Sequence, residues 1–108
     1  MNLTKLAGVL EATGLPVAYA FFPDDQGEPD PPYITYEEVY TSNMGADNKV
    51  YKKLIHVDII LYTSKKDLEH EAKIEEVLDD ASIFYDCTED YDSGQKVYRK
   101  IYEVSMYA

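Results

Sequence analysis

The stretch KVYKKLIHVDIILYT (residues 49–63), followed by SKKDLEHEAKIEEVL (residues 64–78), decides the fold of this chain. Every second position from 55 to 61 is apolar, which is typical of a strand with one buried face. The alternate positions of the same strand mix polar and apolar side chains: His56, Asp58, Ile60 and Tyr62. A second face that is half apolar predicts that another chain covers it.

The second half of this stretch has the pattern of an amphipathic helix. Ser64 offers an N-cap hydroxyl, and Asp67 follows three residues later, as in a variant capping box. Acidic side chains in the first turn complement the helix dipole. The sequence therefore predicts a helix from Ser64 to about Ala81. Its buried stripe is expected to comprise Leu68, Ala72, Ile74 or Glu75, Val77 and Leu78.

The remaining elements are predicted from apolar runs and from the turn residues between them. A first helix is expected over Leu3–Thr13, where Gly14 ends it in a left-handed conformation. Further strands are expected at 17–22, 33–40, 83–91 and 95–107, with loops at 23–32 and 41–48. A turn is expected at 92–94, where Gly94 tolerates positive φ. This order predicts one α+β domain over residues 1–108. Its mostly antiparallel or mixed sheet has about five strands, with two helices on one face. The order of strand pairing stays open.

Composition narrows the classes of function. The chain has 108 residues, 45% of them hydrophobic, and a formal net charge of -11. This charge opposes binding to DNA or to an anionic membrane, because both need clustered Lys and Arg. No apolar run approaches the ~20 residues of a spanning helix. The single Cys87 and the absence of a signal-peptide pattern predict a soluble protein of a reducing cytoplasm.

Motifs for catalysis and metal binding are incomplete. His70 and Glu71 begin like a zinc-protease helix, but Ile74 stands where the second histidine is needed. His56 is a lone strand histidine, and the acidic neighbours of Cys87 should keep its thiol protonated and inert. Oxygen-bearing side chains alternate along a predicted strand as in a calcium-binding loop: Asp86, Thr88, Asp90 and Asp92. The glycine that such a loop requires after its third ligand is replaced by Tyr91. We expect no enzyme activity, no metal and no cofactor.

Tyrosine is the unusual residue, with eleven copies beside three phenylalanines and no tryptophan. Tyrosine buries a large ring while its hydroxyl stays in water, which suits surfaces that a partner covers. Tyrosine also favours strands, so no single one decides the question. The predicted subunit or partner interface comprises Tyr36, Tyr40, Met44, Ile60, Tyr62, Tyr98 and Tyr102, and the predicted contact arms are the loops 23–32 and 41–49.

The layout of the chain resembles phage and prophage tail terminator proteins, the minor tail components that complete the tail and join it to the head. The matching features are the first helix before Gly14-Leu15-Pro16-Val17, the Pro-rich loop into Pro32-Tyr33-Ile34, Asp47-Asn48, Leu61-Tyr62-Thr63 with Lys66-Asp67, and Glu71 with Ile74-Glu75 and Leu78. The resemblance implies a small α+β subunit of a ring, typically six-fold, at the head-proximal end of the tail tube. Its partners would be the tail-tube protein and a head-completion protein. Its location would be the virion, after assembly in the bacterial cytoplasm.

Two other classes stay open. A small acidic protein can imitate DNA with spaced carboxylates and inhibit a host DNA-binding protein. An α+β domain of this size can also be a small-ligand binding protein or an enzyme. Native mass distinguishes the tail terminator from the DNA mimic, because a tail terminator forms a ring and a mimic binds its target as a monomer or dimer.

Overall fold

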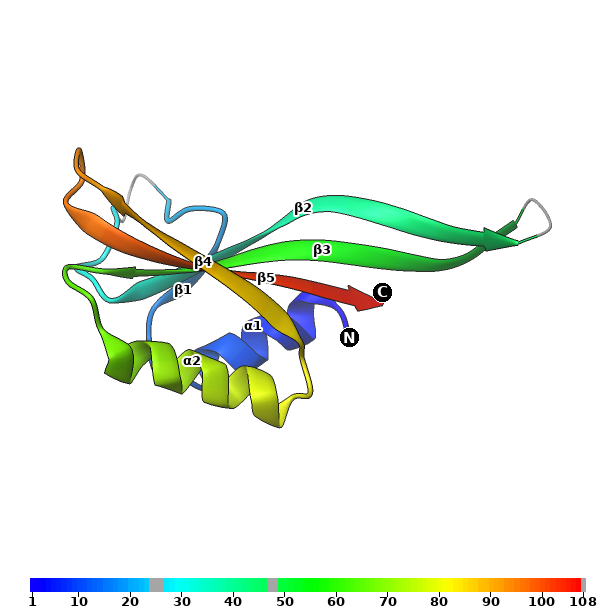
Figure 1. Ribbon diagram of the computed structural model, residues 1–108, viewed down its shortest axis with the longest axis horizontal. Helices are drawn as coiled ribbons and strands as arrows, with labels where there is room; N and C mark the ends of the chain where they lie inside the picture. The colour runs from blue at the N-terminus through cyan, green and yellow to red at the C-terminus, as the bar shows by residue number, and fades with distance from the viewer. Residues whose placement is uncertain (24–26, 47–48, 108) are drawn as a thin grey trace.

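The computed structural model has two helices and one five-stranded sheet, and it confirms the predicted α+β class and element order (Figure 1). The structure describes residues 1–23, 27–46 and 49–107 and, within these ranges, every side chain except those of residues 44, 46 and 49–51. The elements are α1 (Leu3–Glu11), β1 (Val17–Tyr19), β2 (Tyr33–Ala46), β3 (Lys49–Thr63), α2 (Leu68–Asp80), β4 (Tyr85–Asp92) and β5 (Val97–Tyr107).

The sheet is mixed, with the strand order β1-β2-β3-β5-β4. Only the short β1 pairs in parallel, with β2, and the other three pairings are antiparallel. β3 is the central strand, as its long apolar alternation predicts. After β3 the chain passes through α2 to β4 at the edge of the sheet, and β5 then lies between β3 and β4. This order resolves the pairing that the sequence leaves open.

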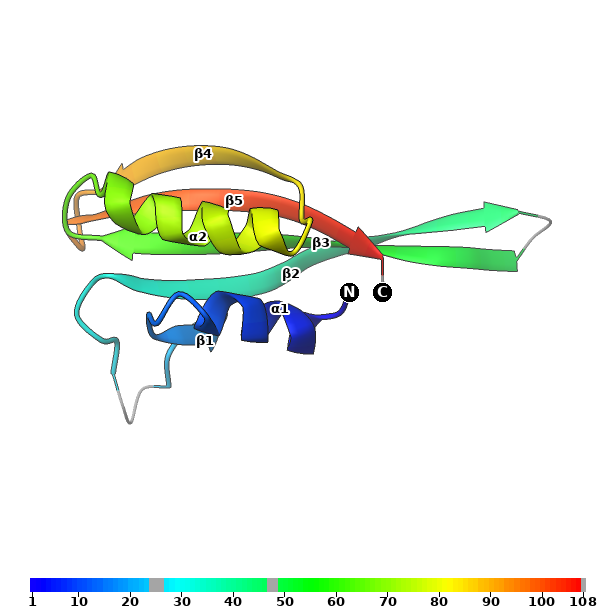
Figure 2. The same cartoon turned by 90° about the horizontal axis from the view of Figure 1, so that it is seen from below.

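Both helices pack on the same face of the sheet and bury the core there (Figure 2). The core consists mainly of side chains from the two helices and the three central strands: Leu6, Leu10, Ile34, Val57, Ile59, Leu61, Ile74, Leu78, Ile83, Tyr102, Val104 and Met106. Burial of such apolar surface is the main stabilising term for a domain of this size. Neither helix in the described part of the chain is long and apolar enough to cross a membrane.

The inward stripe of α2 is narrower than predicted and includes a carboxylate. Its buried residues are Glu71, Ile74 and Leu78, whereas Leu68 is 71% exposed at the first turn. Glu71 is 7% exposed and receives two ammonium groups, Lys66 Nζ at 2.9 Å and Lys100 Nζ at 3.4 Å. These ion pairs allow the carboxylate to be buried, because an unpaired buried charge is strongly destabilising.

The helix α2 begins later than predicted, because Asp67 and not Ser64 is its N-cap. Asp67 Oδ1 accepts a hydrogen bond from the backbone N–H of His70 at 3.1 Å, and Asp67 Oδ2 lies 2.6 Å from His70 Nδ1. The carboxylate thus satisfies a backbone donor that has no partner within the helix. The hydrogen bond from the His70 backbone is the main cause that lowers the pKa of Asp67.

Replacing Asp67 by alanine is expected to reduce the free energy of unfolding by about 1 kcal/mol at neutral pH. The pKa of this carboxyl is lower in the folded state than in the unfolded state, so its stabilisation is present at neutral pH. That stabilisation disappears as the pH falls through the lowered pKa. Urea denaturation at pH 7 and near pH 3 measures both effects. Ser64→Ala is the matched control, and an equal loss in the control would contradict Asp67 as the cap.

Residues 41–46 are strand, so the prediction of a loop at 41–48 is wrong in that part; residues 47–48 lie outside the described residues. β2 continues to Ala46 and pairs with β3 as far as Lys49. β1 pairs only with residues 34–36, and β5 reaches β3 only as far as Leu54. The distal parts of β2 and β3 therefore project from the body as a two-stranded ribbon (Figures 1 and 2). We call residues 41–46 and 49–53 the arm; it lengthens the molecule to 50 × 30 × 23 Å.

Smaller differences concern strand ends and turns. β1 has three residues, ending at Tyr19, and β4 starts at Tyr85 and not at residue 83. In the turn between β4 and β5 the residue at positive φ is Lys96 and not Gly94. Asp92 Oδ1 instead accepts the backbone N–H groups of Gly94 and Gln95 at 2.9 and 3.1 Å, which holds this turn together.

Candidate interaction surface

The face of the sheet opposite the helices is called the open face here, and its side chains form rows across the strands. The rows follow from the pairing register, because directly paired residues share a face. From the end near the β4–β5 turn toward the arm, the rows are Tyr33-Tyr62-Arg99-Asp90, then Thr35-Ile60-Ile101-Thr88, then Glu37-Asp58-Glu103-Asp86, then Tyr40-His56-Ser105. Aromatic, apolar, acidic and polar rows thus succeed one another.

The aromatic row is covered by the chain itself. Tyr33 is 4% exposed and stacks on Tyr62 with ring centroids 4.6 Å apart, and Phe22 meets the Tyr33 ring edge-on at 5.4 Å. The Tyr33 hydroxyl donates a hydrogen bond to Glu28 Oε2 at 3.3 Å. Burial, assisted by the charge of Glu28, raises the pKa of Tyr33 to about 12. Phe22 and the described part of the Pro-rich segment therefore cover this end of the open face, and Thr35 in the next row is also buried.

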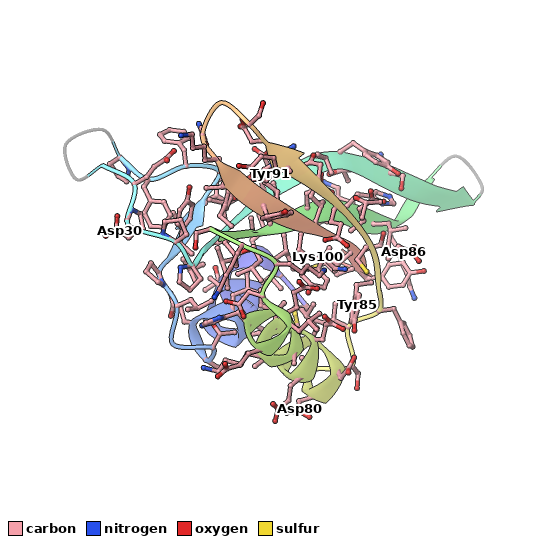
Figure 3. All side chains as sticks on the ribbon, turned by 60° about the vertical axis from the view of Figure 1, so that its left-hand side comes forward. Asp30, Asp80, Tyr85, Asp86, Tyr91 and Lys100 are labelled. Atoms are coloured by element: carbon pink, nitrogen blue, oxygen red, sulfur yellow. The ribbon has the colours of Figure 1, made fainter. Side chains whose placement is uncertain are left out.

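Glu37, Asp58, Glu103 and Asp86 form what we call the carboxylate row, one side chain from each of β2, β3, β5 and β4. None of the four has an ion-pair or hydrogen-bond partner among the described residues. Like charges on directly opposite strand positions destabilise a sheet. Figure 3 shows Asp86 beside Tyr85, which lies on the side of β4 that faces α2. In contrast, Asp90 in the aromatic row is neutralised by Arg99 through contacts of 2.8 and 2.6 Å.

Replacing Glu103 by glutamine is expected to increase the free energy of unfolding by about 0.2–1 kcal/mol at low salt. The reason is that Glu103 has a carboxylate directly opposite on each side, and like charges in such pairs repel. The gain should shrink in 1 M salt, which screens exposed charges. Thermal unfolding at both salt concentrations tests this.

Glu89→Gln is the matched control for the Glu103 substitution. Glu89 Oε2 is paired with Lys66 Nζ at 2.9 Å, so its neutralisation should not stabilise the fold. Equal stabilisation by both variants would show that the net charge, and not the row, is responsible.

The arm leaves backbone groups along both of its edges without a strand partner. On the β2 side, β1 reaches only to Tyr36, and on the β3 side, β5 stops opposite Leu54. An isolated two-stranded ribbon is marginally stable in water, and an open strand edge is a template for pairing with another chain. The arm is therefore the second feature of this molecule that is suited to a partner.

His56 lies between two serines at the base of the arm. Its Nε2 is 2.9 Å from Ser42 Oγ, its Nδ1 is 2.9 Å from Ser105 Oγ, and its ring stacks on Tyr40 at 3.9 Å. The contact resembles part of a catalytic triad. However, hydroxyls occupy both ring nitrogens, and no described carboxylate orients the ring as nucleophilic catalysis requires. The arrangement holds the base of the arm in place.

Other reactive groups on the described surface are isolated. Cys87 is an exposed free thiol. In the described part of the chain, no three His, Cys, Asp or Glu side chains are placed to hold a metal ion.

The predicted interface residues other than Tyr102 fall into three groups. Tyr40, Ile60 and Tyr62 lie on the open face, and Tyr40 is 59% exposed. Tyr36 and Tyr98 lie on the helix side; Tyr36 contacts Tyr19 edge-on at 5.2 Å, and Tyr98 packs against Tyr91 at 4.7 Å. The side chain of Met44 lies outside the described residues, although its backbone belongs to β2.

Tyr102 does not belong to the exposed surface. It is 0% exposed, its hydroxyl donates a hydrogen bond to Glu75 Oε2 at 3.0 Å, and its ring meets Tyr85 edge-on at 5.4 Å. The alternation along β5 puts Tyr102 on the helix side, where it fills the core under α2. Its prediction as an interface residue is therefore wrong for this subunit.

The interface prediction from sequence does not include the carboxylate row or Lys52 and Lys53 of the arm. The row needs the register of four strands, which no single segment contains. The arm has one signal in the sequence: the predicted strand 49–63 is much longer than the predicted strand before it in the chain, 33–40, so part of it overhangs if the two strands pair.

Comparison of the chain with protein-family models and with curated proteins finds no match.

Proposed function

We propose that this chain is a self-assembling structural subunit of a phage or prophage tail, and that it acts as the tail terminator. Copies would form a ring, six-fold as the resemblance implies, at the head-proximal end of the tail tube. The partners would be the tail-tube protein on one side and a head-completion protein on the other. The resemblance in sequence layout supports this role, and the α+β fold agrees with what that resemblance implies. The proposal includes no enzymatic step.

The observation that carries the proposal is the projecting arm. Residues 41–46 and 49–53 extend beyond the core with both strand edges unpaired. A free subunit gains little from such a ribbon, since an isolated hairpin is marginal and an open edge risks aggregation. In an assembly the same ribbon reaches a neighbour and adds contact area. The arm is thus best explained as an element of subunit contact.

The open face supports the same role. Beyond the aromatic row it carries half-buried Ile60 and Ile101 on paired positions, with no helix over them. The arm and the open face are two different patches. A contact between different patches of successive copies is heterologous, and it closes into a ring when the rotation between subunits allows.

A tube-capping assay tests the tail role. The tail-tube protein encoded by the same phage or prophage is polymerised alone and with increasing amounts of this chain, and tube lengths are measured by electron microscopy. A terminator should shorten the tubes and appear as a ring at one tube end. Tubes of unchanged length with no bound ring would contradict the tail role. Bovine serum albumin at equal mass is the control for nonspecific crowding.

A DNA-mimic inhibitor is the second candidate, and the carboxylate row is the observation in its favour. Four acidic side chains lie on successive strands, which are about 4.8 Å apart. A mimic would bind a basic host protein with an affinity that falls steeply in salt. Capture of a host DNA-binding protein that DNA displaces, together with unchanged tube lengths, would favour this candidate over the tail terminator.

A further inference from the structure

The arm and the open face differ in charge. Residues 41–53 contain three lysines and one acidic residue in a chain whose net charge is -11. Of these lysines, Lys52 and Lys53 are described, and both are exposed on β3. Lys52 Nζ lies over the Tyr107 ring, 4.9 Å from its centroid. Neither ammonium has an ion-pair partner among the described residues. The arm is thus a basic element on an acidic protein.

The carboxylate row borders a groove of about 470 Å³ on the open face. Asp58, Asp86 and Glu103 line it, together with the exposed Tyr40 at the base of the arm. A smaller hollow of about 270 Å³ shares Asp86 and Glu103 with the groove and adds Phe84, which is 91% exposed. An acidic floor with exposed aromatic neighbours suits an occupant that has both cationic and apolar groups.

We propose that the arm of one subunit lies across the open face of the next, with its lysines against the carboxylate row. The proposal rests on the self-assembly proposed above and names its contact. The carboxylates of the row repel one another within one subunit, and in the assembly they bind the lysines of the neighbouring subunit's arm. The contact joins different patches of successive copies, so it is heterologous and directs assembly toward a ring or a filament.

The dimensions agree with this contact. At 3.3–3.4 Å per residue, the six residues 41–46 give an arm about 20 Å long. The row spans four neighbouring strands, which is about 14 Å at 4.8 Å per strand. Lys52 and Lys53 are adjacent in a strand and therefore point to opposite faces of the ribbon. Whichever face of the arm is turned toward the neighbour, it presents one of these ammonium groups.

A charge-swap experiment tests the contact. Variant one carries Lys52→Glu and Lys53→Glu in the arm, and variant two carries Asp58→Lys and Glu103→Lys on the open face. Each alone should weaken self-association by at least about 100-fold, because like charges then face each other. An equal mixture should recover association to within about tenfold of the intact chain. The acidic arm of variant one meets the basic face of variant two, and the other contact is unchanged.

Sedimentation velocity gives the native mass in each case, and circular dichroism checks that both variants are folded. The matched controls make the same charge changes at exposed positions on α2 or in the segment before it. They are Lys65→Glu with Lys73→Glu, and Glu76→Lys with Asp80→Lys. These controls should assemble like the intact chain. Assembly that survives both swaps, or a mixture of folded variants that does not recover, would overturn the contact and leave self-assembly intact. An intact chain that stays monomeric would overturn both.

Zero-length carbodiimide cross-linking tests the contact in the intact chain, so misfolding caused by a substitution cannot affect the result. The reagent joins an amine to a carboxylate only when the two are in contact. With equal amounts of ¹⁴N- and ¹⁵N-labelled protein, mass spectrometry should find mixed-label links from Lys52 or Lys53 to Asp58, Asp86 or Glu103. Mixed-label links from other lysines only, or links within one label only, would overturn the contact.

Discussion

Replacing Tyr102 by alanine is expected to reduce the free energy of unfolding by about 3–5 kcal/mol, the range for large aromatic deletions in a core. Tyr102 belongs to β5 and its side chain is completely buried beneath α2, so the substitution leaves a cavity and removes the edge-on contact with Tyr85. A domain of this size has a total stability of about 5–15 kcal/mol. Urea denaturation measures the loss, and a loss below about 1 kcal/mol would contradict Tyr102 as a core residue.

Tyr102→Phe is the matched control, because it keeps the ring and removes only the hydroxyl that donates to Glu75. Its expected cost is about 0.5–1.5 kcal/mol. Burial is the main cause that raises the pKa of Tyr102, and its hydrogen bond to Glu75 acts in the same direction. The folded pKa is then above the unfolded value of about 10, so the contribution of Tyr102 is present below pH 10 and declines as the pH rises. The difference between this variant and the intact chain should therefore narrow in alkaline solution.

Shortening the arm is expected to weaken self-association by about 100-fold or more while the body stays folded. Replacing residues 44–52 by Asn-Gly joins Asn43 to Lys53, which are directly paired, through a two-residue hairpin turn. The core residues of β3 begin beyond this point, so the melting temperature should change by only a few degrees. Sedimentation velocity at matched concentrations measures the association.

An insertion elsewhere controls for disturbance of the surface. Two glycines inserted after Ser93, in the exposed β4–β5 turn, should leave association unchanged. If the shortened chain assembles as tightly as the intact chain, the arm does not carry the subunit contact.

Predictions from sequence succeeded where one face of an element is buried. The alternation in residues 55–61 identified the central strand, and the helical period in residues 68–78 identified α2, because the core imposes these periods. They failed where no face is buried. Residues 41–46 have the polar composition of a loop, yet they form a strand whose pairing with β3 maintains it. The predicted cap of α2 lies three residues early, because Ser64 and Asp67 both have capping side chains.

The candidate surface was accessible from sequence only in part. Of the predicted interface residues, Tyr40, Ile60 and Tyr62 lie on the open face. The shared side expected for Tyr36 and Tyr40 is wrong, because a register shift between Glu38 and Tyr40 places these two tyrosines on opposite faces of β2. The predicted interface includes Tyr102 because the alternation of Tyr98 and Tyr102 along one strand does not reveal which face the helices cover. The carboxylate row was not predicted, since its members are separated by up to 66 residues (Glu37 to Glu103) and meet only through strand register.

The native mass of the intact chain tests the central claim most directly. Native mass spectrometry and sedimentation equilibrium, over concentrations from about 1 µM to 1 mM at physiological salt, determine how many 12.4 kDa copies associate. A closed ring predicts one fixed multiple of the subunit mass that persists as concentration rises. A mass of 12.4 kDa at every concentration would contradict the account.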